Sequence, residues 1–384
     1  MSVRVNTELK EELKRFGVNE WNECFHCGSC TATCPLTEEN HLFPRKAMRY
    51  VQMGLKKKVV TNVDPWLCYY CGDCTTTCPR DANPGEFMMS MRRYLTSVYD
   101  WTGLSKLFYT SKIWEFVFVI LFALAVILSF ILFGPAVDKT LTAQGGVKLN
   151  EFAPISIIEI GDWTMAVIVA FLLISNIFNM FYKIVLSDKK VKVPFISYFI
   201  EIRQLIIHYS TQSRLLKCKK NRSFWVGHWL LMTGYTIMFI VVVVYLPWFQ
   251  TEEVHSFYHP QRLLGYYATF GILFGLSVAI IGRLRKKEEK FKFSHMSDWL
   301  FIIMLYLVTL SGILIHIFRI NGMPMATYYS YVAHMAILVP MIMIEVPFSK
   351  WSHLAYRPFA IYFSRLRRAG IRKQNIKINQ LATA

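Results

Sequence analysis

The sequence predicts an all-α protein in which a soluble helical domain precedes a bundle of six membrane-spanning helices. Six apolar stretches follow residue 100, and each is close to the ~20 residues that a helix needs to cross the hydrocarbon core of a bilayer. The first 100 residues contain no apolar run of that length and carry eight of the nine cysteines. No segment alternates apolar and polar residues as a strand would.

These observations divide the chain into three parts. Residues 1–100 form the soluble domain, 101–360 the membrane part and 361–384 a basic tail. In the soluble domain, the segments 43–54 and 85–94 have the apolar spacing of short helices, and glycine ends the first. The membrane spans are expected at about 114–134, 163–183, 224–248, 263–283, 298–318 and 330–348.

Composition and charge support a membrane location. Hydrophobic residues make up 54% of the chain and the mean hydropathy is +0.33, which is too apolar for a soluble protein with a wet surface. The formal net charge of +18 is spread over the loops between the apolar stretches, which argues against nucleic acid as a partner.

The basic residues also predict the orientation of the chain. They are concentrated in the segments 183–222 and 283–292 and in the tail, whereas the other loops hold few. The positive-inside rule therefore predicts a multi-pass protein of the cytoplasmic (inner) membrane, with both termini and the cysteine domain in the cytoplasm. The amphipathic segment 195–216 is expected to lie along the inner membrane face.

The cysteines form one motif written twice, C-x2-C-x2-C-x3-C-P. Zinc frameworks place two C-x2-C pairs a dozen or more residues apart, whereas each motif here holds four cysteines within eleven residues. This spacing is typical of [4Fe-4S] ligands, so the sequence predicts two clusters. In two-cluster ferredoxins the fourth cysteine of each run binds the other cluster. If the same crossing occurs in this chain, one cluster takes Cys24, Cys27, Cys30 and Cys78, and the other takes Cys68, Cys71, Cys74 and Cys34.

The ninth cysteine, Cys218, stands alone in a basic loop and is expected to be a structural thiol.

Four histidines fall into two pairs by their depth in the expected spans. His228 and His353 lie near the inner membrane face, and His316 and His334 lie near the outer face. Polar groups within a membrane usually have a function, and paired imidazoles can hold a haem iron. We therefore expect two b haems, and at least one, each carrying electrons without substrate chemistry. For the outer haem, Met238, His255 and His259 are alternative ligands to His316.

Glu345 is an acid well inside an expected span and close to the inner face. We expect it to take part in a proton or quinone site, and the alternative is a helix-end residue capped by Lys350 or water.

Both parts of the chain resemble known families. The soluble domain resembles the small iron–sulfur subunit of heterodisulfide reductase, an alpha-helical ferredoxin, at residues 24–30, 44–46, 51–54 and 66–71. The membrane part resembles the cytochrome b gamma subunit of respiratory nitrate reductase, at His334 and residues 347–353. Their fusion resembles the C subunits of the quinone-interacting membrane-bound oxidoreductases of sulfate reducers.

The resemblance implies a membrane subunit that passes electrons between menaquinone and cytoplasmic redox subunits through b haems and two [4Fe-4S] clusters. It implies heterodisulfide reductase-like flavoproteins as neighbours and electron exchange with adenylylsulfate reductase in sulfate respiration. One position departs from the nitrate reductase pattern, because Met238 stands where the third span would supply a second haem ligand. The alternative function is a cluster-bearing anchor that docks soluble redox subunits without haem-mediated quinone chemistry.

Overall fold

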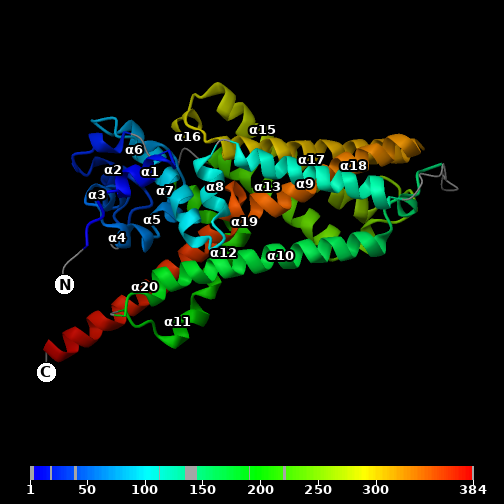
Figure 1. Cartoon of the computed structure of the whole chain (residues 1–384). Helices are drawn as coiled ribbons and strands as arrows, with labels where there is room; N and C mark the ends of the chain where they lie inside the picture. Colours follow the sequence, from blue (N-terminus) through cyan, green and yellow to red (C-terminus); the bar gives the residue numbers. More distant parts are fainter. Residues whose placement is uncertain are drawn as a thin grey trace.

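The structure is a computed structural model that describes residues 4–17, 20–38, 41–111, 113–134, 145–189, 191–218 and 222–382. Within these ranges the chain forms helices joined by turns and loops, and no β-strand, which confirms the all-α prediction. A domain of short helices lies at one end of a bundle of long helices (Figure 1).

The N-terminal domain is built around α7, which begins at the proline following Asn83. The Asn83 side chain caps α7 by accepting a hydrogen bond from the Glu86 amide at 3.4 Å. On the same helix, Arg92 and Arg93 donate from Nε to the carbonyl groups of Pro65 in α5 and of Phe16 after α1, which ties both segments to α7. The domain consists of α1 (Leu9–Lys14), α2 (Ser29–Thr33), α3 (Arg45–Gln52), α4 (Lys56–Val60), α5 (Asp64–Leu67), α6 (Asp73–Thr76) and α7 (Pro84–Tyr99).

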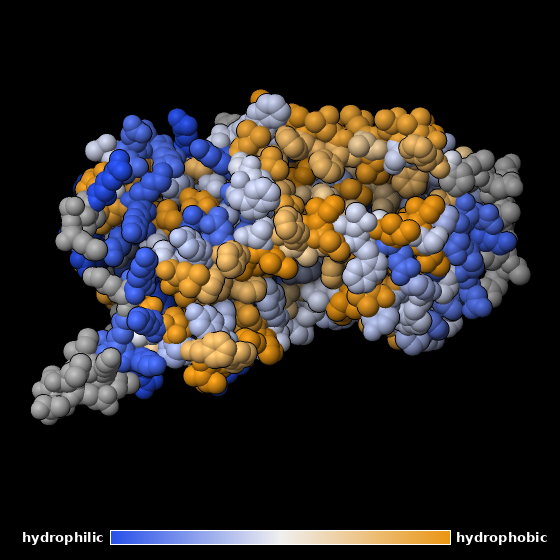
Figure 2. Space-filling model, turned by 60° about the horizontal axis from the view of Figure 1, so that its bottom comes forward, coloured by the Kyte–Doolittle hydropathy of each residue, from blue (hydrophilic) through white to orange (hydrophobic). Residues whose placement is uncertain are grey.

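Six helices among the described residues are long and apolar enough to cross a membrane. The second and sixth begin earlier than the sequence predicts, at Ile155 and Pro324. Hydrophobic side chains gather over the bundle and hydrophilic ones over the N-terminal domain (Figure 2). The helices are α9 (Trp114–Phe133), α10 (Ile155–Phe181) extended by a π-helical turn to Leu186, α13 (Arg222–Val243), α15 (Pro260–Arg285), α17 (Met296–Ile320), and α18 (Pro324–Pro340) with a π-helical turn (Met341–Glu345) and α19 (Val346–Phe348).

Helices α13 and α15 pack closely because glycines face each other across the contact. A Cβ atom on Gly275 would lie 2.5 Å from the carbonyl oxygen of Gly227, and one on Gly271 would lie 2.6 Å from that of Leu230. Small residues allow membrane helices to approach in this way.

Short helices lie at the ends of the bundle. The expected amphipathic segment forms α11 (Phe195–Ile200) and α12 (Ile202–Thr211), and α12 packs against the C-terminal helix. The remaining short helices are α8 (Leu104–Thr110), α14 (Leu246–Phe249) and α16 (Glu289–Lys292).

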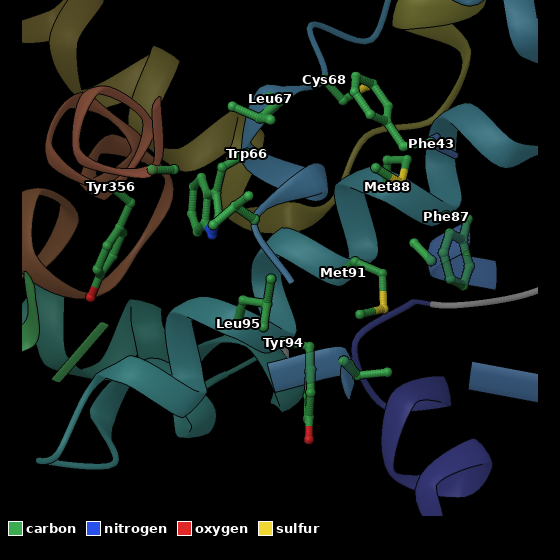
Figure 3. Close-up of a cluster of buried hydrophobic side chains, with 14 of the residues drawn as sticks. Phe43, Trp66, Leu67, Cys68, Phe87, Met88, Met91, Tyr94, Leu95 and Tyr356 are labelled. Carbon is green, nitrogen blue, oxygen red and sulfur yellow. The ribbon is translucent and has the colours of Figure 1, made fainter. Parts of the chain in front are cut away.

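The C-terminal part differs from the basic tail that the sequence suggests. One helix, α20 (His353–Ala382), runs from the bundle to the N-terminal domain (Figure 1). Its Tyr356 packs on Trp66 (Figure 3). The two ring centroids are 5.2 Å apart, and Ser364 Oγ lies 2.8 Å from His41 Nε2. Apolar residues at helical spacing explain the docking, because Tyr356, Ala360 and Phe363 are buried in one core with the N-terminal domain.

Candidate functional site

The first set of cysteines lines one cavity in the N-terminal domain. Cys24, Cys27 and Cys30 face it together with Cys78 from the second motif. The cavity holds about 350 Å³ of space not filled by atoms, its open mouth included. The structure therefore brings together the four thiols that the crossed arrangement requires.

The second set lines a neighbouring cavity of about 330 Å³, measured in the same way. Cys68, Cys71 and Cys74 face it together with Cys34 from the first motif. Because α2 and α6 pack side by side, each motif delivers its fourth cysteine to the other cavity.

Both motifs fold in the same way because glycine starts each short helix. Gly28 (φ 92°) precedes α2 and Gly72 (φ 89°) precedes α6, in a left-handed conformation that side chains rarely adopt. The residue before the second cysteine also has positive φ in each motif, His26 in one and Tyr70 in the other. The backbone thus wraps around each cavity and turns the cysteines inward.

Burial disfavours the charged thiolate form of these cysteines when no metal is bound. Burial raises the pKa of Cys34 to about 11, and repulsion from Cys68 adds to it. Burial likewise raises the pKa of Cys24 and of Cys30, and Cys78 is among the thiols that repel them. Positive charge from bound metal would offset this cost.

The arrangement does not fit a single ion. Among the described residues, no group of three or more His, Cys, Asp or Glu side chains could hold one metal ion. A cubane cluster binds each thiolate to a different iron and therefore accepts a wider spacing than zinc, which holds all four at ~2.3 Å.

Cys218 lies nearer to this chemistry than its place in the sequence suggests. Its thiol is fully buried and forms a side-chain hydrogen bond with Cys71. That bond is the main cause that lowers the pKa of Cys71 and raises that of Cys218. Sequence reasoning missed this contact because the basic loop carries no motif.

The structure brings His228 and His353 together at the end of the bundle that carries the N-terminal domain. Their ring centroids are 6.3 Å apart. His228 Nδ1 donates to Gln212 Oε1 at 2.6 Å, and His353 Nδ1 donates to the carbonyl oxygen of Lys350 at 2.7 Å. Both histidines therefore keep Nε2 available.

This pair fits the axial ligands of one haem iron. Two imidazoles on one metal have centroids about 6 Å apart, since each metal–nitrogen bond is about 2 Å and each Nε2 lies about 1 Å from its centroid. Ligating histidines usually donate their other nitrogen to a carbonyl or carboxylate, as both do here. Arg357, four residues after His353, has a buried Nε without a hydrogen-bond partner among the described residues, which suits a haem propionate.

The outer histidines are not brought together in the same way. His334 Nδ1 lies 2.9 Å from Ser311 Oγ, whereas His316 faces Arg262 at 2.6 Å and Tyr266 at 3.3 Å. Within the described part of the chain, His316 and His334 form no ring contact with each other.

The alternative outer ligands occupy separate places. His255 and His259 stack on one another at 3.9 Å, and Met238 packs in the bundle core beside α17 and α18. None of them forms a ring or polar contact with His334 in the described residues.

A short series of contacts connects the second cysteine set with His228. Tyr69, next to Cys68, lies with its hydroxyl 3.4 Å from His208 Nδ1 on α12. Arg357 lies over the Tyr69 ring at 4.3 Å from its centroid. Gln212, which ends α12, holds His228. His208, expected at the membrane interface, is thus buried between the two parts of the molecule.

Glu345 lies in the π-helical turn and is fully buried. Ser349 connects it with Glu115 at the start of α9, because the Ser349 amide donates to the main-chain carbonyl of Glu345 and its hydroxyl group donates to the Glu115 carboxylate. The sequence does not single out Glu115, because an acid in the first turn of a span resembles an ordinary helix-end residue.

Comparisons with known proteins support the cluster domain. Residues 20–82 match the family model of the 4Fe-4S dicluster domain. Over 63 residues the chain is 32% identical to the C subunit of the H(2):CoB-CoM heterodisulfide,ferredoxin reductase of Methanothermobacter marburgensis and of Methanothermobacter thermautotrophicus. The match covers 16% of this chain and 34% of each relative, so the chain spans about a third of their length. No solved structure matches the chain.

The N-terminal part is thus an iron–sulfur domain similar to part of a heterodisulfide reductase, and it is joined to helices long enough to cross a membrane. This combination indicates membrane-associated electron transfer.

Proposed function

We propose that this chain passes electrons between a membrane quinone and soluble redox subunits, through a haem b held by His228 and His353 and through two [4Fe-4S] clusters. The observation that carries the proposal is the proximity of the histidine pair to the second cysteine set, through Tyr69, His208 and Arg357.

Each cluster would take the four cysteines that line one cavity, Cys24, Cys27, Cys30 and Cys78 for the first and Cys68, Cys71, Cys74 and Cys34 for the second. Haem b with two imidazole ligands supplies one-electron transfer and leaves no open position for oxygen. Gln212 and the Lys350 carbonyl orient the two rings. Arg357, which lies over the Tyr69 ring beside the second cysteine set and four residues after His353, would offer positive charge to a haem propionate.

The remaining parts of the proposal rest on the resemblance. Menaquinone is the expected quinone, and heterodisulfide reductase-like flavoproteins are the expected partners on the cytoplasmic side. Adenylylsulfate reductase is the expected exchange partner. A second haem near the outer face would use His334, with His316, Met238, His255 or His259 opposite.

The haem b content of the purified full chain tests the proposal, by a pyridine haemochrome assay after anaerobic preparation. Two haems per chain support an inner and an outer site, and one supports the inner site alone if His353→Ala removes it. No haem, with iron and sulfide still bound, would support the cluster-bearing anchor instead.

A variant of Gln212 refines the test. Gln212→Leu removes the acceptor of His228 Nδ1, so haem retention should fall by about 10–100-fold, as is usual when a ligand loses its orienting partner. Gln250→Leu is the matched control. The Gln250 side chain donates to Asn150 and to the carbonyl oxygen of Ala153, and both of these residues are distant from His228 in the sequence and share no described contact with it. Equal haem affinity in both variants would count against the inner site.

A further inference from the structure

Two carboxyl groups from opposite ends of the membrane part meet in the bundle. Glu115 on α9 is 2% exposed and Glu345 in the π-helical turn is 0% exposed, and Ser349 bonds to both, with its hydroxyl group to the Glu115 carboxylate and with its amide to the main-chain carbonyl of Glu345, so the two acids are neighbours. Two carboxylates buried side by side repel each other, and burial disfavours the charge on both, so one of the two is protonated. The pair therefore holds a proton, as adjacent buried acids commonly do.

The neighbouring hydroxyl groups indicate which acid carries the proton. Ser297 Oγ donates to one oxygen of Glu115 at 2.7 Å, and Ser349 Oγ donates to the other. No described donor meets hydrogen-bond geometry with either oxygen of Glu345, although Ser349 is nearby. Because two donated bonds stabilise charge on Glu115, the proton resides on Glu345.

The cations near the pair are directed at other acids. Asp298 on α17 forms an ion pair with Lys350 at 2.6 Å, Arg93 and Arg283 also act on Asp298, and Arg93 pairs with Glu86 at 2.7 Å. Tyr109 from α8 lies near the same acids. Among the described residues no cation forms an ion pair with Glu115 or Glu345, which favours uptake of another proton by the carboxyl pair.

Hydrogen-bonding groups lead from the pair toward the surface. Ser297 Oγ donates to Glu115 and lies 3.2 Å from His295 Nδ1, which accepts from the Ser297 amide, so a proton passes on when the Ser297 hydroxyl group turns from Glu115 to Nδ1. His295 caps α17, is half-buried and follows the basic segment at α16. Burial and the nearby Arg93 lower the pKa of His295 to about 4, so this imidazole is neutral at pH 7 and readily releases a proton that reaches it.

We propose that Glu345, Glu115, Ser297 and His295 form a proton path between the membrane interior and the side that carries the N-terminal domain. This role rests on the proposed function. Quinol oxidation releases two electrons and two protons, and the electrons leave one at a time through the proposed haem. Each proton in turn binds the Glu115 carboxylate, so that the carboxyl pair then holds two protons. Release of one proton through Ser297 and His295 returns the pair to its one-proton state.

Infrared spectroscopy of the full chain tests the shared proton independently of quinone chemistry. The wild type should show the C=O stretch of a protonated carboxyl group that Glu345→Gln removes and that Glu115→Gln shifts but retains. Asp162→Asn, which changes another buried acid on α10, should leave this band in place. A band that survives Glu345→Gln, or a wild type without it, would overturn the assignment.

Deuterium exchange of the same band tests the path. Ser297→Ala should slow exchange by about 100-fold or more, in the range usual for loss of a positioned proton carrier. Ser129→Ala is the control, because Ser129 bonds only its own helix on α9. Equal exchange in the two variants would contradict the path. If quinol fails to reduce the wild type while the band behaves as expected, the proposed function is wrong and the shared proton stands.

Discussion

At the scale of single residues, the candidate chemistry depends on which side-chain atoms remain free. His228 and His353 use Nδ1 for carbonyl oxygens and keep Nε2. His316, by contrast, has both ring nitrogens within 2.8 Å of one Arg262 nitrogen. Histidine can therefore act as a ligand at one end of the bundle, whereas at the other end His316 belongs to a polar cluster with Arg262 and Tyr266.

Substitution of single cysteines tests the crossed ligand sets. Cys78→Ser should abolish the magnetic signature of the cluster bound by Cys24, Cys27 and Cys30, because Cys78 faces their cavity. Cys34→Ser should instead abolish that of the other cluster. Each change should remove up to about half of the bound iron, measured by electron paramagnetic resonance and iron analysis.

Cys218→Ser is the control for both cysteine variants. Cys218 hydrogen-bonds to Cys71 but lines neither cavity, so iron content should stay at the wild-type level. If Cys78→Ser and Cys34→Ser disturb the same cluster, the crossed arrangement is wrong.

At the scale of elements, departures from the regular α-helix position the site. The sixth span changes from α-helix to a π-helical turn directly after Pro340, whose missing N–H removes a helix hydrogen bond. This turn carries Glu345 and is followed by a break at Ser349, after which His353 starts α20. Glu345 and His353 thus belong to different helices, although the sequence places them close together.

Helix packing between α13 and α15 should control haem binding as well as stability. A methyl group on Gly275 would meet the Gly227 carbonyl oxygen at 2.5 Å, so Gly275→Ala should push α13, and with it His228, away from α15. We expect a loss of about 1–3 kcal/mol in stability, measured by thermal unfolding in detergent, and a lower haem content.

Gly161→Ala on α10 is the matched control, because a methyl group there meets no atom within 4 Å. Equal unfolding temperatures for the two variants would show that the glycine contact contributes little.

At the scale of the whole molecule, the N-terminal domain and the bundle share one hydrophobic core. Helix α20 contributes Tyr356 to it, and the loop before α13 contributes Leu215 and Cys218. The polar contact between Tyr69 and His208 lies at the same junction. The cysteine sets are therefore held at a fixed position relative to the histidine pair.

Acid should weaken this junction. Burial, with the nearby Arg357, lowers the pKa of His208 to about 3, against about 6.5 in an unfolded chain. The neutral imidazole therefore contributes stability that is complete above pH 6.5 and is lost as the pH falls toward 3. The loss should approach about 1.4 kcal/mol per pH unit for this one group.

Thermal unfolding between pH 7.5 and 5.5 measures this effect, by comparison of wild type with His208→Asn, which cannot titrate. The wild type should lose more stability over about one pH unit below 6.5 than the variant. An identical pH dependence of the two proteins would exclude His208 as the cause.

The sequence by itself determined the features that depend on local spacing. The doubled C-x2-C-x2-C-x3-C-P run indicated clusters because the spacing of cluster ligands is fixed within a short segment of chain. The six apolar stretches predicted membrane spans because the thickness of the bilayer sets the length of a spanning helix. The helices at 45–52 and 84–99 likewise follow from proline starts and apolar periodicity.

Only the tertiary structure decided which distant residues meet. Glu115 joins Glu345, Gln212 holds His228, Cys218 contacts Cys71, and α20 docks on the N-terminal domain. Helix rotation and helix pairing decide such contacts, and neither leaves a periodic signal in one sequence. The sequence therefore determined the chemical groups and their depth, and packing between helices decided how those groups are paired.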